Sequence, residues 1–142
     1  MSDTTTPSGS TTPSVRRASE FSRDVVGAGK GTVRQVLIGD DQGPNFALRR
    51  FIMEPGGGMP RHTNTVEHEQ YVLRGRATIG IGSETFTVSA DDVVYIPAGV
   101  PHWYRAEGDT PFEFLCVVPN LEDRIELVPE EGAPGGTDAD AC

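Results

Sequence analysis

Short apolar segments separated by glycine-rich or acidic turns set the strongest limit on what this chain can form. The turns include GDDQGP, EPGGG, GIGSE and PAGVP. Closely spaced segments of this kind predict short strands, and therefore an all-β sandwich or barrel. The predicted strands are Val33–Ile38, Asn45–Met53, Gln70–Leu73, Ala77–Ile81, Thr85–Val88, Val93–Ile96 and Phe112–Val118. A helix is expected only near Ser14–Asp24, and Leu121–Leu127 is expected to form a short terminal turn or strand.

The chain has 142 residues, which favours one domain with one core. Residues 1–14 and 129–142 are rich in Pro, Gly, Thr and acidic side chains, and they contain almost nothing that a core could bury. Segments of this composition are typically disordered, so we expect two disordered tails, the second of them acidic. The folded barrel is expected to span residues 15–128.

The net charge is −9, and roughly half of it lies in the two terminal segments. This balance argues against binding to a nucleic-acid backbone, which needs clustered Lys and Arg. No apolar run approaches the roughly 20 residues that a membrane helix needs, and residues 1–14 lack the apolar stretch of a secretory signal. We therefore expect a soluble, cytoplasmic protein with neither nucleic acid nor membrane as partner.

The segment Phe112–Val118 alternates in a way that separates two faces. Phe112, Phe114, Cys116 and Val118 share one face, which is predicted to point into the core. At Cys116 a small buried hydrophobic side chain is favoured over a reactive thiol, and both interpretations stay open. With Cys142 as the only other cysteine, the chain has no disulfide framework.

The chain contains three histidines, His62, His68 and His102, and all of them flank predicted strands. Neutral imidazole is the commonest transition-metal ligand, which suggests a metal site. His62 and His68 would lie about 20 Å apart on a straight strand, so a shared ion requires a bend at Thr63–Val66. Asn64 and Thr65 are poor strand formers that could supply it. Spacing alone leaves open that these are ordinary surface or core histidines.

Two segments resemble the motifs of the cupin superfamily. Gly56–Gly75 resembles the first motif, G-x5-H-x-H-x3,4-E-x6-G, and Asp91–Ala106 resembles the second, G-x5-P-x-G-x2-H-x3-N. Both occur in order and together include all three histidines. The resemblance covers about Phe46 to Pro119 and is closest to small single-domain bacterial cupins with one conserved barrel. It implies a double-stranded β-helix, also called a jelly-roll barrel, with a metal ion inside its open end.

The departures from the motifs bear on the ligand set. Asn64 stands where the family usually has its second histidine, and His68 stands where it usually has glutamate. The second change resembles a histidine-rich subset that binds manganese or a similar ion through four histidines. The resemblance therefore implies one divalent ion (Mn, Fe, Ni or Zn) held by His62, His68 and His102, with Asn64 or water as the fourth ligand. Asp91 and Ala106 replace Gly and Asn at a barrel turn, and we attach no chemistry to them.

Strand parity sorts the neighbours of these ligands. Glu67 and Glu69 have the opposite parity to His68 and should face solvent, whereas Gln70 shares its parity. The predicted substrate pocket consists of Gln70, Phe112, Phe114 and Cys116. Other candidates for its mouth are Arg49 or Arg50, Arg61, Trp103 and Tyr104. Because imidazole and amide ligands leave the charge of the ion uncompensated, an anionic guest is favoured.

The leading functional hypothesis is a metal-dependent oxygenase (dioxygenase-like) that acts on a small organic molecule. The alternative is a non-catalytic binding module for a metal or small ligand. An isomerase or lyase is the second alternative, and it is weakened because the motifs show no inward Glu or Tyr that could serve as general base. An open edge at Val33–Ile38, together with the resemblance to small cupins, which are usually dimers, predicts a homodimer.

Overall fold

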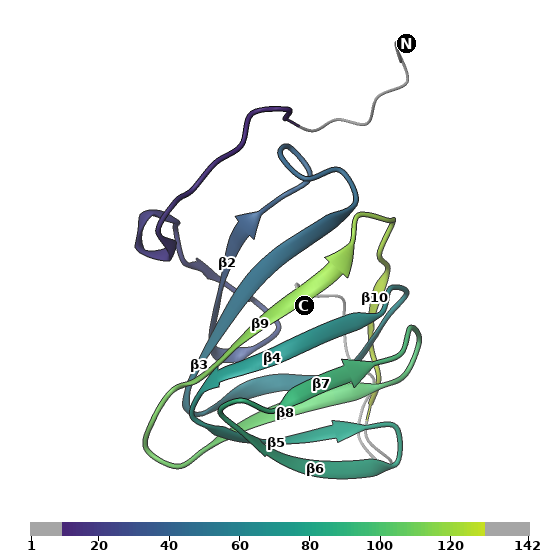
Figure 1. Ribbon diagram of the computed structural model, residues 1–142. Helices are drawn as coiled ribbons and strands as arrows, with labels where there is room; N and C mark the ends of the chain where they lie inside the picture. Colours follow the sequence, from purple (N-terminus) through teal and green to yellow (C-terminus); the bar gives the residue numbers. More distant parts are fainter. Residues whose placement is uncertain (1–9, 130–142) are drawn as a thin grey trace.

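The computed structural model describes residues 10–129 and consists mainly of strands (Figure 1). The only other regular element in this range is the short 3-10 turn η1, Ala18–Glu20. No helix in the described range is long and apolar enough to cross a membrane. The strands are β1 (Asp24–Val25), β2 (Lys30–Ile38), β3 (Phe46–Asn64), β4 (His68–Arg74), β5 (Arg76–Ile81), β6 (Glu84–Ser89), β7 (Val93–Ile96), β8 (His102–Glu107), β9 (Phe112–Pro119) and β10 (Ile125–Leu127).

The predicted tails fall mostly outside the described range, because residues 1–9 and 130–142 are not part of it. The described part of the first tail lies beside the turn between β2 and β3, where Ser10 N–H donates to the Gln42 carbonyl at 3.0 Å. Within the segment Ser14–Asp24, for which a helix is predicted, only η1 forms. Leu121–Leu127, the predicted terminal turn or strand, contains β10.

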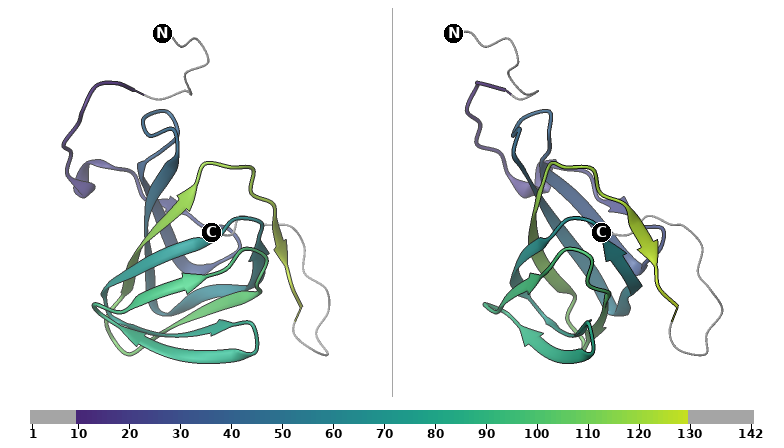
Figure 2. Two further views of the ribbon diagram at one scale, coloured as in Figure 1. Left: turned by 45° about the vertical axis from the view of Figure 1, so that its right-hand side comes forward. Right: turned by 90° about the vertical axis from the view of Figure 1, so that its right-hand side faces the viewer.

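All strand pairs are antiparallel, and they follow the order β6-β5-β8-β3-β9-β4-β7. The sheet curls so that its two ends, β6 and β7, approach each other across a seam (Figures 1 and 2). β1 and β2 extend it on one side of β3, and β10 pairs with the far end of β3. This arrangement confirms the predicted all-β double-stranded β-helix.

The strand β3 is longer than the sequence indicated. The prediction ended it at Met53, before the turn sequence EPGGG, and this was wrong, since β3 continues for 19 residues to Asn64. Pairing with β2 shifts register between Lys30–Gly58 and Thr32–Met53, so the glycines form an irregularity within the strand instead of a reversal. Gly56, at φ 81°, adopts a backbone conformation that other residues rarely take. One continuous strand therefore joins the core to the histidine-bearing end.

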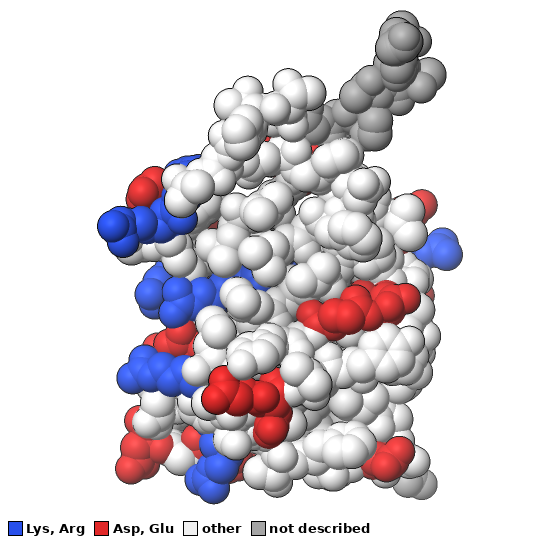
Figure 3. Space-filling view, viewed as in Figure 1, with Lys and Arg blue, Asp and Glu red and all other residues white. Residues whose placement is uncertain are grey.

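The core is an aromatic stack inside the curled sheet. Phe114 lies 5.2 Å from Phe51, 5.3 Å from Tyr104 and 5.3 Å from Phe112, measured between ring centres. Phe51, Phe112 and Phe114 are fully buried, and burial of each such side chain contributes roughly 1.5–3 kcal/mol. The predicted inward face of β9 is thereby confirmed. Charged side chains are few on the outer surface over the middle of β4 and β9, in the view of Figure 3.

One turn carries backbone strain. Asp91 is the only residue other than glycine with positive φ among residues 10–129, at 76°. The motif that the sequence resembles has glycine at this position. The positive φ explains that glycine, because glycine adopts it without strain. Asp is one of the few side chains that tolerate this conformation, and the Tyr71 hydroxyl donates to its Oδ1 at 2.8 Å.

We expect Asp91→Ala to lower the free energy of unfolding by up to about 1 kcal/mol, because it keeps a Cβ at positive φ and removes the hydrogen bond. Asp91→Gly should change stability less, since relief of strain offsets the lost bond. Urea unfolding of both variants measures the difference, and Tyr71→Phe isolates the hydrogen bond. An Asp91→Ala protein more stable than Asp91→Gly would contradict this account.

Candidate metal centre

The sheet brings the three histidines to one end of the barrel. His62 and Asn64 lie at the end of β3, and His68 begins β4 after a turn at Thr65–Glu67. His102 begins β8 and is the cross-strand partner of His62. The bend that a shared site requires is therefore present, and it falls within one residue of the segment predicted for it.

The three imidazole rings are buried against one another. Each histidine is at most 1% exposed. The ring centre of His102 lies 4.2 Å from that of His62 and 5.6 Å from that of His68. Imidazoles on adjacent positions of one ion, with metal–nitrogen bonds of about 2.1 Å, have ring centres about 4.5–5.5 Å apart. The spacing therefore fits one shared ion after small adjustments of the rings.

Hydrogen bonds fix the tautomers of two of these rings. His62 Nδ1–H donates to the Pro60 carbonyl at 2.8 Å, and His102 Nδ1–H donates to the Val100 carbonyl at 2.9 Å. Because a carbonyl only accepts, the proton sits on Nδ1 and Nε2 carries a lone pair. Ligating histidines are held in this way by a partner on their second nitrogen. The Nε2 atoms of His68 and His102 are buried and have no hydrogen-bond partner in the described part of the chain.

Within residues 10–129, no three His, Cys, Asp or Glu side chains are placed so that they could hold a metal ion without rearrangement. The fit to a metal ion thus rests on ring spacing, burial and tautomers. The ligand set of His62, His68, His102 and Asn64 stays a prediction.

Burial also keeps the three imidazoles neutral. It lowers the pKa of His62, lowers that of His102 to about 4, and, with the charge of Arg49, lowers that of His68 to about 2. A metal ligand must be neutral imidazole, so all three are in the required form near pH 7. Since these values lie below the 6.5 of an unfolded histidine, the unfolded chain binds more protons. Their contribution to stability is complete above about pH 6.5 and decreases as pH falls.

Asn64 is oriented by a carboxylate that sequence reasoning missed. Its Nδ2 donates to Asp123 Oδ2 at 3.0 Å, which turns the amide oxygen to the opposite side of the group. Asp123 Oδ1 also accepts from the Thr65 N–H at 2.9 Å and so holds the turn between β3 and β4. No local pattern indicates this contact, because Asp123 lies 59 residues from Asn64 in the sequence.

Cys116 lies in a polar cluster beside His68. Its Sγ is 3.2 Å from His68 Nδ1, and it accepts from an Arg49 amino group at 3.4 Å and from Gln70 Nε2 at 3.6 Å. Burial raises the pKa of this thiol, which is therefore neutral at pH 7. Of the two interpretations left open, complete burial and the raised pKa favour the small buried side chain over a reactive thiol, and the sulfur also contacts an imidazole, a guanidinium and an amide.

Several side chains predicted for the pocket or its mouth lie buried inside the barrel. Gln70 Nε2 donates to the Tyr104 hydroxyl at 2.7 Å, and the Tyr104 ring lies edge-on to His102 at 5.9 Å. Tyr104 is thus inside the barrel and not at its mouth. Its parity with His102 along β8 could have indicated this. Phe112 and Phe114 belong to the closed aromatic stack.

The two candidate arginines lie on opposite faces of β3. Arg49 points inward to Cys116, whereas Arg50 forms an ion pair with Glu113 on the outer face. Trp103 lies over Gly80, where any Cβ would collide with its indole ring, and Arg105 stacks on it 5.6 Å from the ring centre.

Glu67 and Glu69 are exposed, as their parity predicted. The hydrogen bond that protonated Glu69 donates to the neighbouring Glu67 carboxylate raises the pKa of Glu69 to about 7. Both side chains lie on the surface. They are not among the side chains buried around the histidines.

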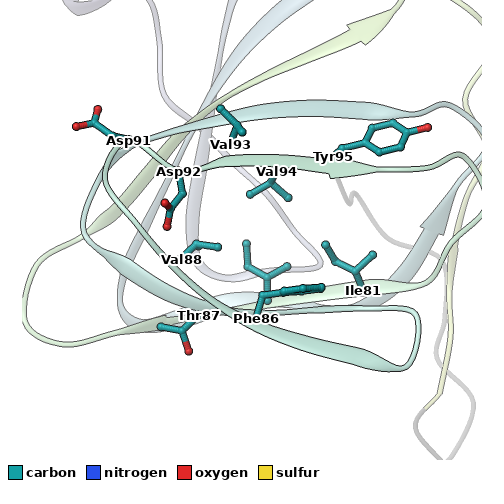
Figure 4. A pocket seen from close by; sticks show the side chains of 10 residues that line it. Ile81, Phe86, Thr87, Val88, Asp91, Asp92, Val93, Val94 and Tyr95 are labelled. Atoms are coloured by element: carbon teal, nitrogen blue, oxygen red, sulfur yellow. The ribbon is translucent and has the colours of Figure 1, made fainter.

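A cleft of about 470 Å³ opens at the seam between β6 and β7 (Figure 4). Its lining is mainly apolar, with Asp91 and Asp92 at one end and Ile81 and Tyr95 toward the other. Ile81 is the cross-strand partner of His102, so this second end lies beside the histidines. None of the four side chains predicted for the substrate pocket lines this cleft.

The chain is similar to several known proteins in sequence and in structure. A cupin domain family model matches residues 49–118. A cupin 2 domain-containing protein from Halorhodospira halophila is 30% identical, with 71% of this chain and 72% of that chain covered and a TM-score of 0.66. The polyketide cyclase RemF from Streptomyces resistomycificus is 26% identical, with a TM-score of 0.77 and coverage of 87% and 90%.

A curated relative is 1-methylthio-D-xylulose 5-phosphate methylsulfurylase from Rhodospirillum rubrum. It is 32% identical over 101 residues, which are 71% of this chain. The chain spans 64% of the length of that protein.

We expect bound metal to depend on all three histidines. Changes in groups that only hydrogen-bond to a ligand weaken metal affinity about 10- to 100-fold, and loss of a ligand in His62→Ala, His68→Ala or His102→Ala should exceed this. Elemental analysis of protein purified without a nickel column measures occupancy. Glu67→Gln is the control. It changes the exposed neighbour of His68 and should retain metal. Full occupancy in His68→Ala would disprove the assignment.

The same measurement tests Asn64. If its amide oxygen binds the ion, Asn64→Ala should lose metal more readily and Asn64→His should hold transition metals more tightly. Unchanged affinity in both variants would mean that water is the fourth ligand.

Proposed function

Because the chain belongs to the cupin family, whose barrels often bind a metal ion, we propose that it is a metal-dependent enzyme acting on a small organic molecule. We propose further that the reaction is proton transfer or ring closure at a carbonyl compound. The observation that carries this proposal is the Tyr104 hydroxyl, buried beside the histidines and held by Gln70.

A divalent ion bound by His62, His68 and His102 would supply a Lewis acid that polarises a carbonyl group. Tyr104 provides the proton-transfer group that such chemistry needs. Its oxygen accepts a hydrogen bond from Gln70, which holds the hydroxyl in place beside the histidines. Stacking on Phe114 and contact with His102 fix the position of the phenol ring. Tyr104 lies in the second motif and is buried, which corrects the prediction that the motifs contain no inward Tyr.

The similarity to a polyketide cyclase supports this proposal, because it extends over nearly the whole of both chains. The name of that protein describes a ring-forming enzyme. The similarity to the methylsulfurylase carries less weight for the reaction, since this chain spans only part of that protein.

An oxygenase is the second candidate. The observation that favours it is the uncharged set of three imidazoles, which suits iron or manganese as well as zinc. Oxygen chemistry requires a redox-active metal, whereas Lewis-acid chemistry also proceeds with zinc. The identity of the metal that supports turnover therefore distinguishes the two.

We expect the metal-free protein, reconstituted separately with Zn²⁺, Mn²⁺ or Fe²⁺, to catalyse solvent deuterium exchange or ring closure of 1,3-diketones and β-keto acids with zinc as well as manganese, without oxygen uptake. Loss of a positioned proton-transfer group typically slows catalysis about 10²- to 10⁴-fold, so Tyr104→Phe should show that loss while keeping its metal. Tyr95→Phe, which removes an exposed hydroxyl, is the matched control.

Oxygen uptake that requires iron or manganese and disappears with zinc would identify an oxygenase instead. Binding of a panel member without turnover under any metal would favour a binding module.

We also propose that the chain forms a homodimer through the edge of β2. Within residues 10–129, β1 pairs with this edge at Val33 and Arg34, and the Val26 N–H donates to the Thr32 carbonyl. Beyond them, Val36 and Ile38 are 40% and 38% exposed. An uncovered edge promotes aggregation, and pairing with a second copy covers it symmetrically.

Light scattering at micromolar concentration should therefore give twice the mass of the chain. Val36→Lys should shift the protein toward the monomer, because a charge at a strand edge opposes pairing. A monomeric wild-type protein would refute the proposal.

A further inference from the structure

Arg49 is a cation inside the barrel that has no carboxylate partner among residues 10–129. One of its amino groups donates to Cys116 Sγ at 3.4 Å and lies 3.5 Å from His68 Nδ1. Its Nε is buried and makes no hydrogen bond within the same range. None of the ion pairs formed there includes Arg49. Arg49 therefore has no ion-pair partner in this part of the chain.

The adjacent arginine shows what a structural role looks like on the same strand. Arg50 lies on the opposite face of β3, where Glu113 binds both it and Arg74. An arginine that serves only the sheet is thus paired there. A partly buried charge without a counter-ion is unfavourable. The charge of Arg49 therefore adds little to the stability of the fold.

The side chains that contact Arg49 or share its sulfur partner do not supply a negative charge. His68 is a neutral imidazole, Gln70 is an uncharged amide, and both lie against the sulfur of Cys116. A divalent ion in the proposed metal centre would add positive charge next to the guanidinium. The interior then presents two positive groups to any ligand that enters.

We propose that Arg49 binds an oxyanion, a carboxylate or phosphate group, of the ligand that this site takes. The Nε–H and a neighbouring amino N–H of a guanidinium lie parallel and match two oxygens of such a group. This inference rests on the proposed function and names the substrate class for the same site. Phe51, whose ring centre lies 5.3 Å from the guanidinium carbon, packs under Arg49 and limits its movement.

Calorimetric titration with paired probes tests the proposal. Benzoate and benzamide have nearly the same shape and differ in charge, as do acetate and acetamide, and phenyl phosphate tests the second oxyanion. A charge-assisted hydrogen bond corresponds to about a 10- to 100-fold gain in affinity, so wild-type protein should prefer the anion of a pair by at least about tenfold. The preference should persist in metal-free protein, because Arg49 remains.

Arg49→Gln should abolish the preference, and Arg49→Lys should retain part of it, since lysine keeps the charge but not the parallel donors. Arg50→Gln is the matched control and should leave binding unchanged. Equal binding of anion and amide by the wild type, absence of binding by every probe, or an intact preference in Arg49→Gln would overturn the proposal. Circular dichroism establishes that each variant is folded, and Arg49→Lys still tests the proposal if Arg49→Gln does not fold.

Metal content, measured on the same samples, separates this result from the proposed function. A protein that binds metal but shows no anion preference would refute the role of Arg49 alone. A protein that prefers anions but binds no metal would refute the metal-dependent enzyme and leave the oxyanion site in place.

Discussion

The turn at Thr65–Glu67 is the constraint on which the site depends. Without it, His62 and His68 would lie about 20 Å apart along one strand. With it, both rings reach the ring of His102. Asp123 holds this turn through the Thr65 N–H, and Thr65 Oγ1 accepts from the Arg124 N–H at 2.9 Å. The segment before β10 therefore matters to the site although it carries no proposed ligand.

The interior divides into an apolar part and a polar part along the same strands. Tyr104 lies where the two parts meet. Its ring stacks on Phe114, and its hydroxyl oxygen accepts a hydrogen bond from Gln70 Nε2. The aromatic stack contributes burial energy that the polar part cannot, since neutral histidines and an arginine without a counter-ion are unfavourable in a dry interior. The aromatic stack thus provides most of the stability of the barrel. The polar part can therefore contain side chains that are unfavourable for folding but suited to binding a ligand.

How far the sequence could predict this structure follows from the range of each interaction. Strand parity and turn residues are local, so the all-β fold, the inward face of β9 and the bend near Asn64 were predictable. The continuation of β3 through EPGGG was not, because glycines permit a bulge as well as a reversal and only pairing with β2 decides between them. Parity also left Arg49 and Arg50 undecided until β9 was placed beside them. Asp123 gave no signal, since its contact exists only after folding.

Glu113, on the outer face of β9, determines the register of this strand. Burial alone would raise the pKa of Glu113, but hydrogen bonds and charges from Arg50 and Arg74 lower it, so the carboxylate stays ionised between strands β3 and β4. A slip of β9 by one residue would turn Glu113 into the aromatic stack and move Cys116 away from His68. An ionised carboxylate in that stack is strongly unfavourable, which excludes the slipped register. The position of Glu113 on the outer face thereby fixes the register of β9 that places Cys116 beside His68.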